Sequence, residues 1–133
     1  MTQFLTPDEF ALKLYDFRTP GKLAYVGLVP SVVAFLTTGD YFADMLSHMN
    51  DVSEIYNGKI QFYAVDVNQY PILGKEFGIR VIPTTIFSPV SSAAAVVSGL
   101  IGKKSELEEL TLRFVPLISM PNQPTSGLIL PGK

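Results

Sequence analysis

The sequence predicts an α/β fold in which a central mixed β-sheet of four to five strands is flanked by helices on both faces. Two continuous apolar runs, Ser31–Leu36 and Ile60–Val67, are typical of strands that are buried on both faces. Residues 41–56 between them repeat apolar side chains with the period of a helix. The chain has 133 residues and is 47% hydrophobic, so one domain can bury a core of its own.

The first helix is predicted to begin at Thr6-Pro7-Asp8-Glu9. Thr6 and Glu9 can form a capping box, in which each side chain accepts a hydrogen bond from the other residue's backbone N–H, and proline suits the first helical position. A loop at Arg18–Lys22 should end the helix, and Leu23–Gly27 are expected to form a short strand. The expected apolar face of this helix consists of Phe10, Leu12, Leu14, Tyr15 and Phe17.

The long central helix is predicted from about Tyr41 to Tyr56, and Asn57-Gly58 should end it. Polar residues occupy the opposite side of this helix, which is therefore expected to face solvent. Phe42 is expected to be buried and Tyr41 partly exposed. The apolar side consists of Tyr41, Phe42, Met45, Leu46, Met49, Val52 and Tyr56.

The second half of the chain predicts a short helix, a hairpin and a last helix. The short helix should begin at Pro71 and end at Gly78. Strands are expected at Thr84–Phe87 and Ala93–Ser98, joined by a turn. A second capping box at Ser105–Glu108 should open the last helix. Its inward side chains are expected to be Leu107, Leu110 and Phe114.

We expect one domain over residues 1–115 and a proline-rich, extended tail over residues 116–133. The tail contains apolar clusters at Leu117-Ile118, Met120 and Leu128-Ile129-Leu130. It is expected either to pack at the surface with little order or to occupy a groove of its own domain or of a neighbour, which would allow self-association.

Composition argues against several classes of partner. Ten Lys and Arg against twelve Asp and Glu give a net charge of −2, which does not favour nucleic-acid binding. No apolar run is long enough to span a membrane. The N-terminus lacks the features of a signal peptide, so the cytoplasm is the default compartment, and the periplasm would follow if a leader had been removed. No cofactor is expected, and the absence of cysteine excludes disulfides, thiolate nucleophiles and cysteine-ligated metals among these residues.

Three motifs make the chain similar to the thioredoxin family. Residues 77–84, Phe-Gly-Ile-Arg-Val-Ile-Pro-Thr, resemble the family's stretch around its cis-proline, and Gly99 follows Pro83 where the family keeps a glycine. Residues 66–71, Asp-Val-Asn-Gln-Tyr-Pro, resemble the strand end and helix start before that stretch. The resemblance covers roughly residues 6–115, and it implies a thioredoxin-like fold with a cis bond between Ile82 and Pro83.

The chain departs from this family at every position that carries the redox reaction. Where the family has Cys-x-x-Cys at the start of the long helix, the sequence reads Asp40-Tyr41-Phe42-Ala43, so Asp40 and Ala43 occupy the two cysteine positions. Gly39 replaces the family's tryptophan, and Ala34 replaces its buried carboxylate. The nucleophile, the resolving thiol and the proton acceptor are all missing, which indicates that the whole reaction has been lost.

Other chemistry is weaker in the sequence. Asp40 is expected to be an N-cap or first-turn acid. Asp40, Asp44 and His48 lie at helical spacing and could hold a metal, but they belong to a generally polar face, so no metal site is expected. Residues 99–105 resemble a phosphate loop only superficially, because the glycine spacing is wrong.

Three functions remain open. The first is a non-catalytic module that binds a protein or extended peptide in the former substrate groove. The second is a structural or assembly subunit that uses its tail or outer faces. The third is unrecognised catalysis, or a homologue of the disulfide oxidoreductases that lacks their cysteines. The groove of the first hypothesis would consist of Gly39, Asp40, Tyr41, Phe42, Ile82, Pro83 and Gly99.

Overall fold

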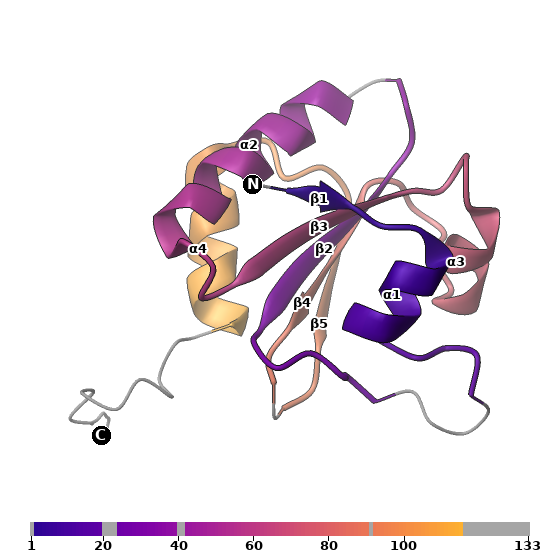
Figure 1. Cartoon of the computed structure of the whole chain (residues 1–133). Coiled ribbons are helices and arrows are strands. Elements are labelled where there is room, and N and C mark those ends of the chain that lie inside the picture. The colour runs from indigo at the N-terminus through magenta and orange to yellow at the C-terminus, as the bar shows by residue number, and fades with distance from the viewer. Residues whose placement is uncertain (1, 20–23, 40–41, 91, 116–133) are drawn as a thin grey trace.

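The structure, a computed structural model, describes residues 2–19, 24–39, 42–90 and 92–115. Within them, a five-stranded mixed sheet with strand order β1-β3-β2-β4-β5 lies between two pairs of helices (Figure 1). This confirms the predicted fold class. The elements are β1 (Gln3–Phe4), α1 (Pro7–Lys13), β2 (Ser31–Leu36), α2 (Phe42–Tyr56), β3 (Gln61–Asp66), α3 (Pro71–Glu76), β4 (Thr84–Ser88), β5 (Ala95–Ser98) and α4 (Lys104–Phe114).

The central strand β2 is buried along its whole length, as its apolar sequence predicts. It pairs in parallel with β3, from Ser31 opposite Gln61 to Leu36 opposite Asp66. On its other side it pairs antiparallel with β4, with Phe35 opposite Thr84. A strand between two neighbours and under helices on both faces has no side that could tolerate polar residues, which explains the continuous apolar run.

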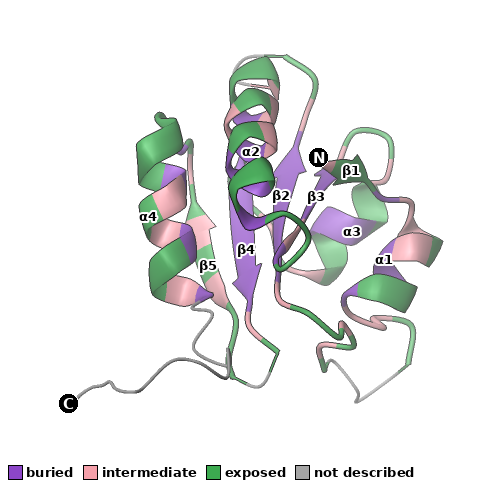
Figure 2. Cartoon of the chain, turned by 60° about the vertical axis from the view of Figure 1, so that its left-hand side comes forward, coloured by how far each residue is buried: buried purple, intermediate pink, exposed green. Residues whose placement is uncertain are grey.

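Two hydrophobic clusters hold the helices to the two faces of the sheet (Figure 2). On one face, α2 and α4 pack over residues such as Met49, Phe87 and Leu107. On the other face, α1 and α3 pack over Phe10, Phe35 and Leu73, among others. The outer sides of the helices are largely exposed, as the green surfaces in Figure 2 show.

The start of α1 confirms the predicted capping box. The hydroxyl of Thr6 accepts a hydrogen bond from the backbone N–H of Glu9 at 3.2 Å, and the Glu9 carboxylate accepts one from the N–H of Thr6 at 2.9 Å. The predicted apolar face is wrong in one position, because Leu12 is 80% exposed. The helix ends at Lys13, so Tyr15 and Phe17 reach the core from the following turns rather than from a helical stripe.

The predicted strand at Leu23–Gly27 is wrong for the residues that the structure describes. Residues 24–27 contain only an isolated antiparallel bridge between Tyr25 and Tyr15. The backbone N–H of Val26 donates to the carbonyl of Leu14 at 2.8 Å. This segment therefore pairs with the turn that ends α1 and not with the sheet, and Leu23 lies outside the described residues.

The long helix α2 follows its prediction from Phe42 onward, while Tyr41 lies outside the described residues. Met45, Met49 and Val52 are fully buried on the predicted side. Asn57 and Gly58 end the helix with positive φ angles of 48° and 87°, as expected for a C-terminal cap.

Two features near the chain ends differ from the predictions. The edge strand β1, which pairs in parallel with β3, was not predicted, since two exposed residues give no periodicity. The capping box at Ser105 is wrong, because α4 already begins at Lys104 and its N-cap residue, Lys103, makes no side-chain cap hydrogen bond. Leu107 is buried, and Leu110 and Phe114 pack against the core as predicted.

The predicted tail, residues 116–133, lies outside the described residues, and its extended conformation stays a prediction. Across the ranges that the structure describes, no helix has the length and apolar character needed to cross a membrane.

Candidate binding site at the Pro83 loop

Three loops meet at one end of the sheet because of the strand directions. The chain leaves β2 toward Gly39 at the end where β4 begins, since Phe35 lies opposite Thr84. It leaves β5 toward Gly99 at the same end, since Thr84 lies opposite Ser98. The topology therefore brings the loops that contain Gly39, Pro83 and Gly99 to a common edge, as the resemblance implied.

The Pro83 loop is held from both sides. The peptide bond between Ile82 and Pro83 is cis, and Pro83 is buried. Its carbonyl accepts a hydrogen bond from the backbone N–H of Gly99 at 2.7 Å. The hydroxyl of Thr84 donates to the carbonyl of Val81. The first bond joins the loop to the end of β5, and the second holds the backbone of the loop itself.

The outer edge of this loop makes no hydrogen bond with the part of the chain that the structure describes. Neither the N–H groups of Val81 and Ile82 nor the carbonyl of Ile82 forms a hydrogen bond with another described residue. The side chains beside this edge are apolar and accessible, with exposed fractions of 48% for Val81, 37% for Ile82 and 39% for Leu100. An ordered backbone edge with free donors and acceptors, next to apolar side chains, can accept an extended chain as an additional strand.

Gly99 allows the backbone to turn beside Pro83. Its φ angle is +98°, which side chains rarely tolerate, although a Cβ atom there would meet nothing within 4 Å. The glycine is therefore needed for the backbone conformation and not for space. This conformation places the Gly99 N–H on the Pro83 carbonyl.

Phe42 is not brought to the Pro83 loop. Its ring stacks on Phe4 of β1, with ring centroids 5.9 Å apart, and it packs against the cluster under α2. Two strands, β3 and β2, separate β1 from β4. The backbone N–H of Phe42 bonds the carbonyl of Gly39 at 3.3 Å, so Phe42 anchors the start of the helix. Asp40 and Tyr41 lie outside the described residues, and Ala43 is exposed.

Alanine occupies the position at which the resemblance implied a buried carboxylate. Ala34 is completely buried and lies directly opposite Thr85 on β4. The Thr85 hydroxyl is buried as well and has no hydrogen-bond partner within the described part of the chain. A buried hydroxyl without a partner costs about 1–3 kcal/mol. An unsatisfied polar group thus lies directly opposite Ala34, the position at which the resemblance implied a buried carboxylate.

Replacing Thr85 by valine should therefore stabilise the domain by about 1 kcal/mol, because the change removes the unpaired hydroxyl at nearly constant shape. Urea unfolding followed by circular dichroism measures the difference. Thr111→Val is the matched control, since the Thr111 hydroxyl is also buried but donates to the Leu107 carbonyl at 2.7 Å. The control should be neutral or slightly destabilising. A less stable Thr85→Val variant would contradict the expectation.

The residues considered for a metal do not form a described site. Among the residues that the structure describes, no group of three or more His, Asp or Glu side chains could hold a metal ion. Asp44 and His48 are included in that statement, but Asp40 is not.

Sequence reasoning missed Val81 and Leu100 as members of this surface. Both are large apolar residues next to residues of the Pro83 motif, and both are exposed. Their position beside Ile82 and Gly99 is the signal that could have identified them, since an apolar side chain next to an exposed loop backbone extends the surface a partner can contact.

Comparisons with known proteins agree with this geometry. No family model matches the chain. A curated thioredoxin from Borreliella burgdorferi is 26% identical over 98 residues, which is 73% of this chain and 84% of that protein. Chloroplastic thioredoxin z has a similar structure, with a TM-score of 0.65 and 17% identity over 84% of this chain and 92% of that chain. The Trx4 domain of ERdj5 has a TM-score of 0.63 and 17% identity over 82% of this chain and 90% of that one.

Proposed function

We propose that this chain, which is thioredoxin-like in sequence and in fold and contains no cysteine, is a redox-inactive module that binds an extended protein or peptide segment at its Pro83 loop. Thiol–disulfide exchange requires a thiolate that attacks a disulfide, and residues 1–133 supply none. Binding of a segment by the Pro83 loop needs no thiol, so this binding can persist when the reaction is lost.

The observation that carries this proposal is that the backbone of Ile82 makes no hydrogen bond with the described residues. A bound segment would donate to the Ile82 carbonyl and accept from its N–H, as a strand does when it is added to the edge of a sheet. Because the loop is already fixed by the hydrogen bond from Gly99 to Pro83, little entropy would be lost from the protein on binding.

The surroundings of the loop favour an apolar partner segment. Val81, Ile82 and Leu100 are exposed and uncharged, and Arg80 is the charged residue that lies next to them in the chain. Specificity would arise from alternate side chains of the bound strand that contact these apolar residues.

The test is capture of a partner from an extract of the source cells by the intact chain and by Ile82→Glu. The glutamate places a charge where an apolar partner side chain would be buried, so capture should fall at least tenfold, which corresponds to about 1.4 kcal/mol. Ile55→Glu is the matched control, because Ile55 is 50% exposed on α2, away from the three loops. It should capture the partner as the intact chain does.

The control also separates this proposal from a role in assembly. Loss of capture in Ile82→Glu alone, with both variants equally folded, supports binding at the loop. Equal capture by both variants would overturn it and would favour a structural subunit that uses another surface. Zero-length crosslinking of the captured partner to the chain, followed by peptide mapping, would then identify that surface.

A further inference from the structure

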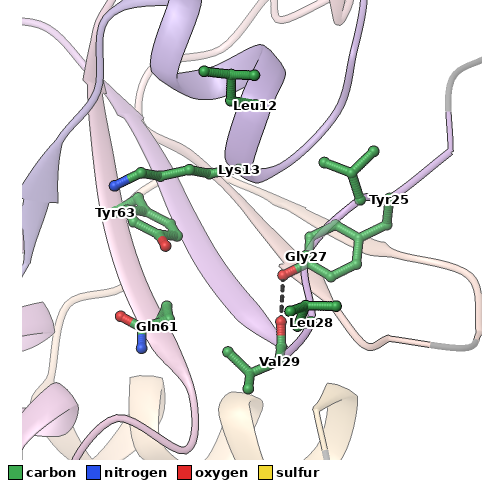
Figure 3. Close-up of a pocket in the computed structure, with 9 residues that line it drawn as sticks. Leu12, Lys13, Tyr25, Gly27, Leu28, Val29, Gln61 and Tyr63 are labelled. Atoms are coloured by element: carbon green, nitrogen blue, oxygen red, sulfur yellow. Dashed lines mark hydrogen bonds between the residues drawn. The ribbon is translucent and has the colours of Figure 1, made fainter.

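A second apolar surface lies at the opposite end of the sheet from the Pro83 loop. An open groove of about 550 Å³ lies between the end of α1, the loop before β2 and the start of β3 (Figure 3). Gln61 at the start of β3 lines it, and Gln61 lies opposite Ser31, the first residue of β2. The Pro83 loop is near the last residues of β2, so the two surfaces are separate.

The groove is lined largely by apolar side chains that are unusually accessible. Leu28 is 94% exposed and Leu12 is 80% exposed, and Val26 and Val29 are 43% and 37% exposed. Single exposed apolar residues are common, but several around one concave surface indicate a binding surface. Leu12 was the residue that the helical pattern wrongly placed in the core, and its position at this groove gives it another role.

Two tyrosines give the groove a rigid aromatic lining. The Tyr25 hydroxyl donates to the carbonyl of Val29 at 2.6 Å, which fixes the ring (Figure 3). Burial raises the pKa of Tyr25 to about 12, so this hydroxyl remains a neutral donor at physiological pH. Tyr63 is nearly buried, and the Lys13 ammonium lies 6.0 Å from the centre of its ring. The Tyr25 hydroxyl, the Lys13 ammonium and the Gln61 amide N–H thus already have partners, which leaves the apolar surface for an occupant.

The C-terminal tail, residues 116–133, has the composition of a segment that needs such a surface. Six of its eighteen residues are Leu, Ile or Met, and Lys133 is its one charged side chain. Four prolines exclude a continuous helix and favour an extended, polyproline-like chain. Extended proline-rich segments commonly bind in grooves that are lined by aromatic rings.

The tail leaves the domain at the correct end of the sheet. The ring of Phe114, the last residue of α4, lies 5.7 Å from that of Phe87 in β4. Phe87 pairs with Val32, the second residue of β2, so α4 ends near the starts of β2 and β3 (Figure 1). The groove opens at this end, on the other face of the sheet, since Tyr63 belongs to the cluster under α1.

The length of the tail is sufficient to reach the groove. Leu128 is thirteen positions beyond Val115 (128 − 115 = 13), and at about 3.1 Å per residue this stretch spans about 40 Å. Passing from the helix layer on one face to that on the other requires about 20 Å, two layers of about 10 Å each. The tail can therefore cross the end of the sheet and still place its last apolar cluster in the groove.

We infer that the tail folds back across the end of its own domain and that Leu128, Ile129 and Leu130 occupy the groove between α1 and the loop before β2. The tail covers the exposed side chains of Leu12 and Leu28. It acts as a built-in ligand of this groove and leaves the Pro83 loop free.

The absence of cysteine makes a direct test straightforward. Ser126→Cys in the full chain provides a single attachment point for a nitroxide label beside the apolar cluster. The label broadens the NMR signals of nearby backbone amides. The amides of Leu28 and Gln61 should lose most of their intensity, while the amide of Gly99 at the other end of the sheet should keep its intensity.

Leu28→Asp in the labelled chain should restore the lost signals, because a carboxylate in the groove opposes burial of the tail. Leu28 is almost fully exposed, so the substitution leaves the core intact. Leu112→Asp is the matched control, at a 57% exposed leucine on α4, and should keep the broadening. Broadening that survives Leu28→Asp, or unaffected groove amides in the parent chain, would overturn the inference.

Mixing labelled chains with separate ¹⁵N-enriched, unlabelled chains distinguishes the tail of the same molecule from that of a second copy. Groove signals that are broadened only within one molecule support the inference. Equal broadening between molecules would overturn it and assign the groove to self-association.

Discussion

Phe10→Ala should destabilise the domain by about 3–5 kcal/mol, the range for removing a large buried aromatic side chain. Phe10, on the inner side of α1, is completely buried. Its ring lies within 5.0 Å of Phe77, 6.0 Å of Phe35 and 6.2 Å of Phe17, measured between ring centroids. The substitution leaves a cavity bordered by these aromatic rings, and it removes aromatic contacts beyond the lost burial. The loss approaches the whole stability of many domains of this size.

Leu12→Ala in the same helix is the matched control. It also truncates a large apolar side chain, but Leu12 is 80% exposed, so the expected change in the free energy of unfolding is below about 0.5 kcal/mol. Urea unfolding of both variants, followed by far-ultraviolet circular dichroism, measures the difference. Similar destabilisation by the two substitutions would contradict the assignment of Phe10 to the core and Leu12 to the surface.

The contrast between these two residues shows where sequence patterns succeed. A continuous apolar run such as Ser31–Leu36 needs no knowledge of its neighbours, because burial on both faces allows only one kind of residue. A helical stripe identifies a buried face only as long as the helix continues. Leu12 lies two residues after Phe10 in α1, which at about 100° per residue places it on the opposite side of the helix, away from the sheet. The helix ends at Lys13, so Tyr15 and Phe17 reach the core from the turns that follow it.

Two other predictions from the sequence, at the edge strand and at the start of the last helix, failed for local reasons. The strand β1 contains two residues, which is too short for any periodicity, and its pairing with β3 depends on where the rest of the chain places that edge. The capping box at Ser105 had the right residue types, but α4 begins at Lys104, two residues before Glu106, so Ser105 lies inside the first turn. A motif defined by spacing cannot distinguish between such neighbouring starts.

The candidate site was predictable in part. The motif around Pro83 identified the loop, and strand order placed Gly39 and Gly99 at the same end of the sheet. The sequence could not indicate that the Ile82 backbone makes no hydrogen bond with the described residues, because such pairing depends on which segments the fold brings next to the loop. It also could not indicate that the ring of Phe42 stacks on Phe4 and not beside Pro83.

The proposed function separates binding from reaction. The loop proposed to bind an extended segment is supported by ordinary backbone hydrogen bonds, such as the one from Gly99 to Pro83. The reaction depends on thiols and on a buried acid, which cost stability and which the chain does not carry. Without thiols, the free-energy cost of burying an acid has no functional return. The domain is therefore more stable with alanine at position 34 than with an acid.

Ala34→Asp should therefore destabilise the domain by about 4 kcal/mol at neutral pH, which corresponds to a carboxyl pKa raised by about three units through burial. Ala34 is completely buried in the cluster under α2 and α4. In the folded variant the carboxyl binds its proton more tightly than in the unfolded chain, so stability falls as pH rises from about 4 to the raised pKa. Urea unfolding at pH 4 and at pH 7 measures this dependence.

Ala34→Val controls for size, since valine occupies a similar volume without a charge. The valine variant should lose stability through overpacking alone, equally at both pH values, so the electrostatic penalty is the difference between the two variants at pH 7 minus that at pH 4.

Thr85 refines the test, because its hydroxyl lies directly opposite and can donate to the new carboxylate. Thr85→Val, stabilising in the parent chain, should destabilise the Ala34→Asp variant, and this reversal of sign measures the coupling. Equal stability of the aspartate and valine variants at pH 7 would contradict the expectation. It would mean that position 34 tolerates a charge, so the cost of burying an acid could not explain the alanine there.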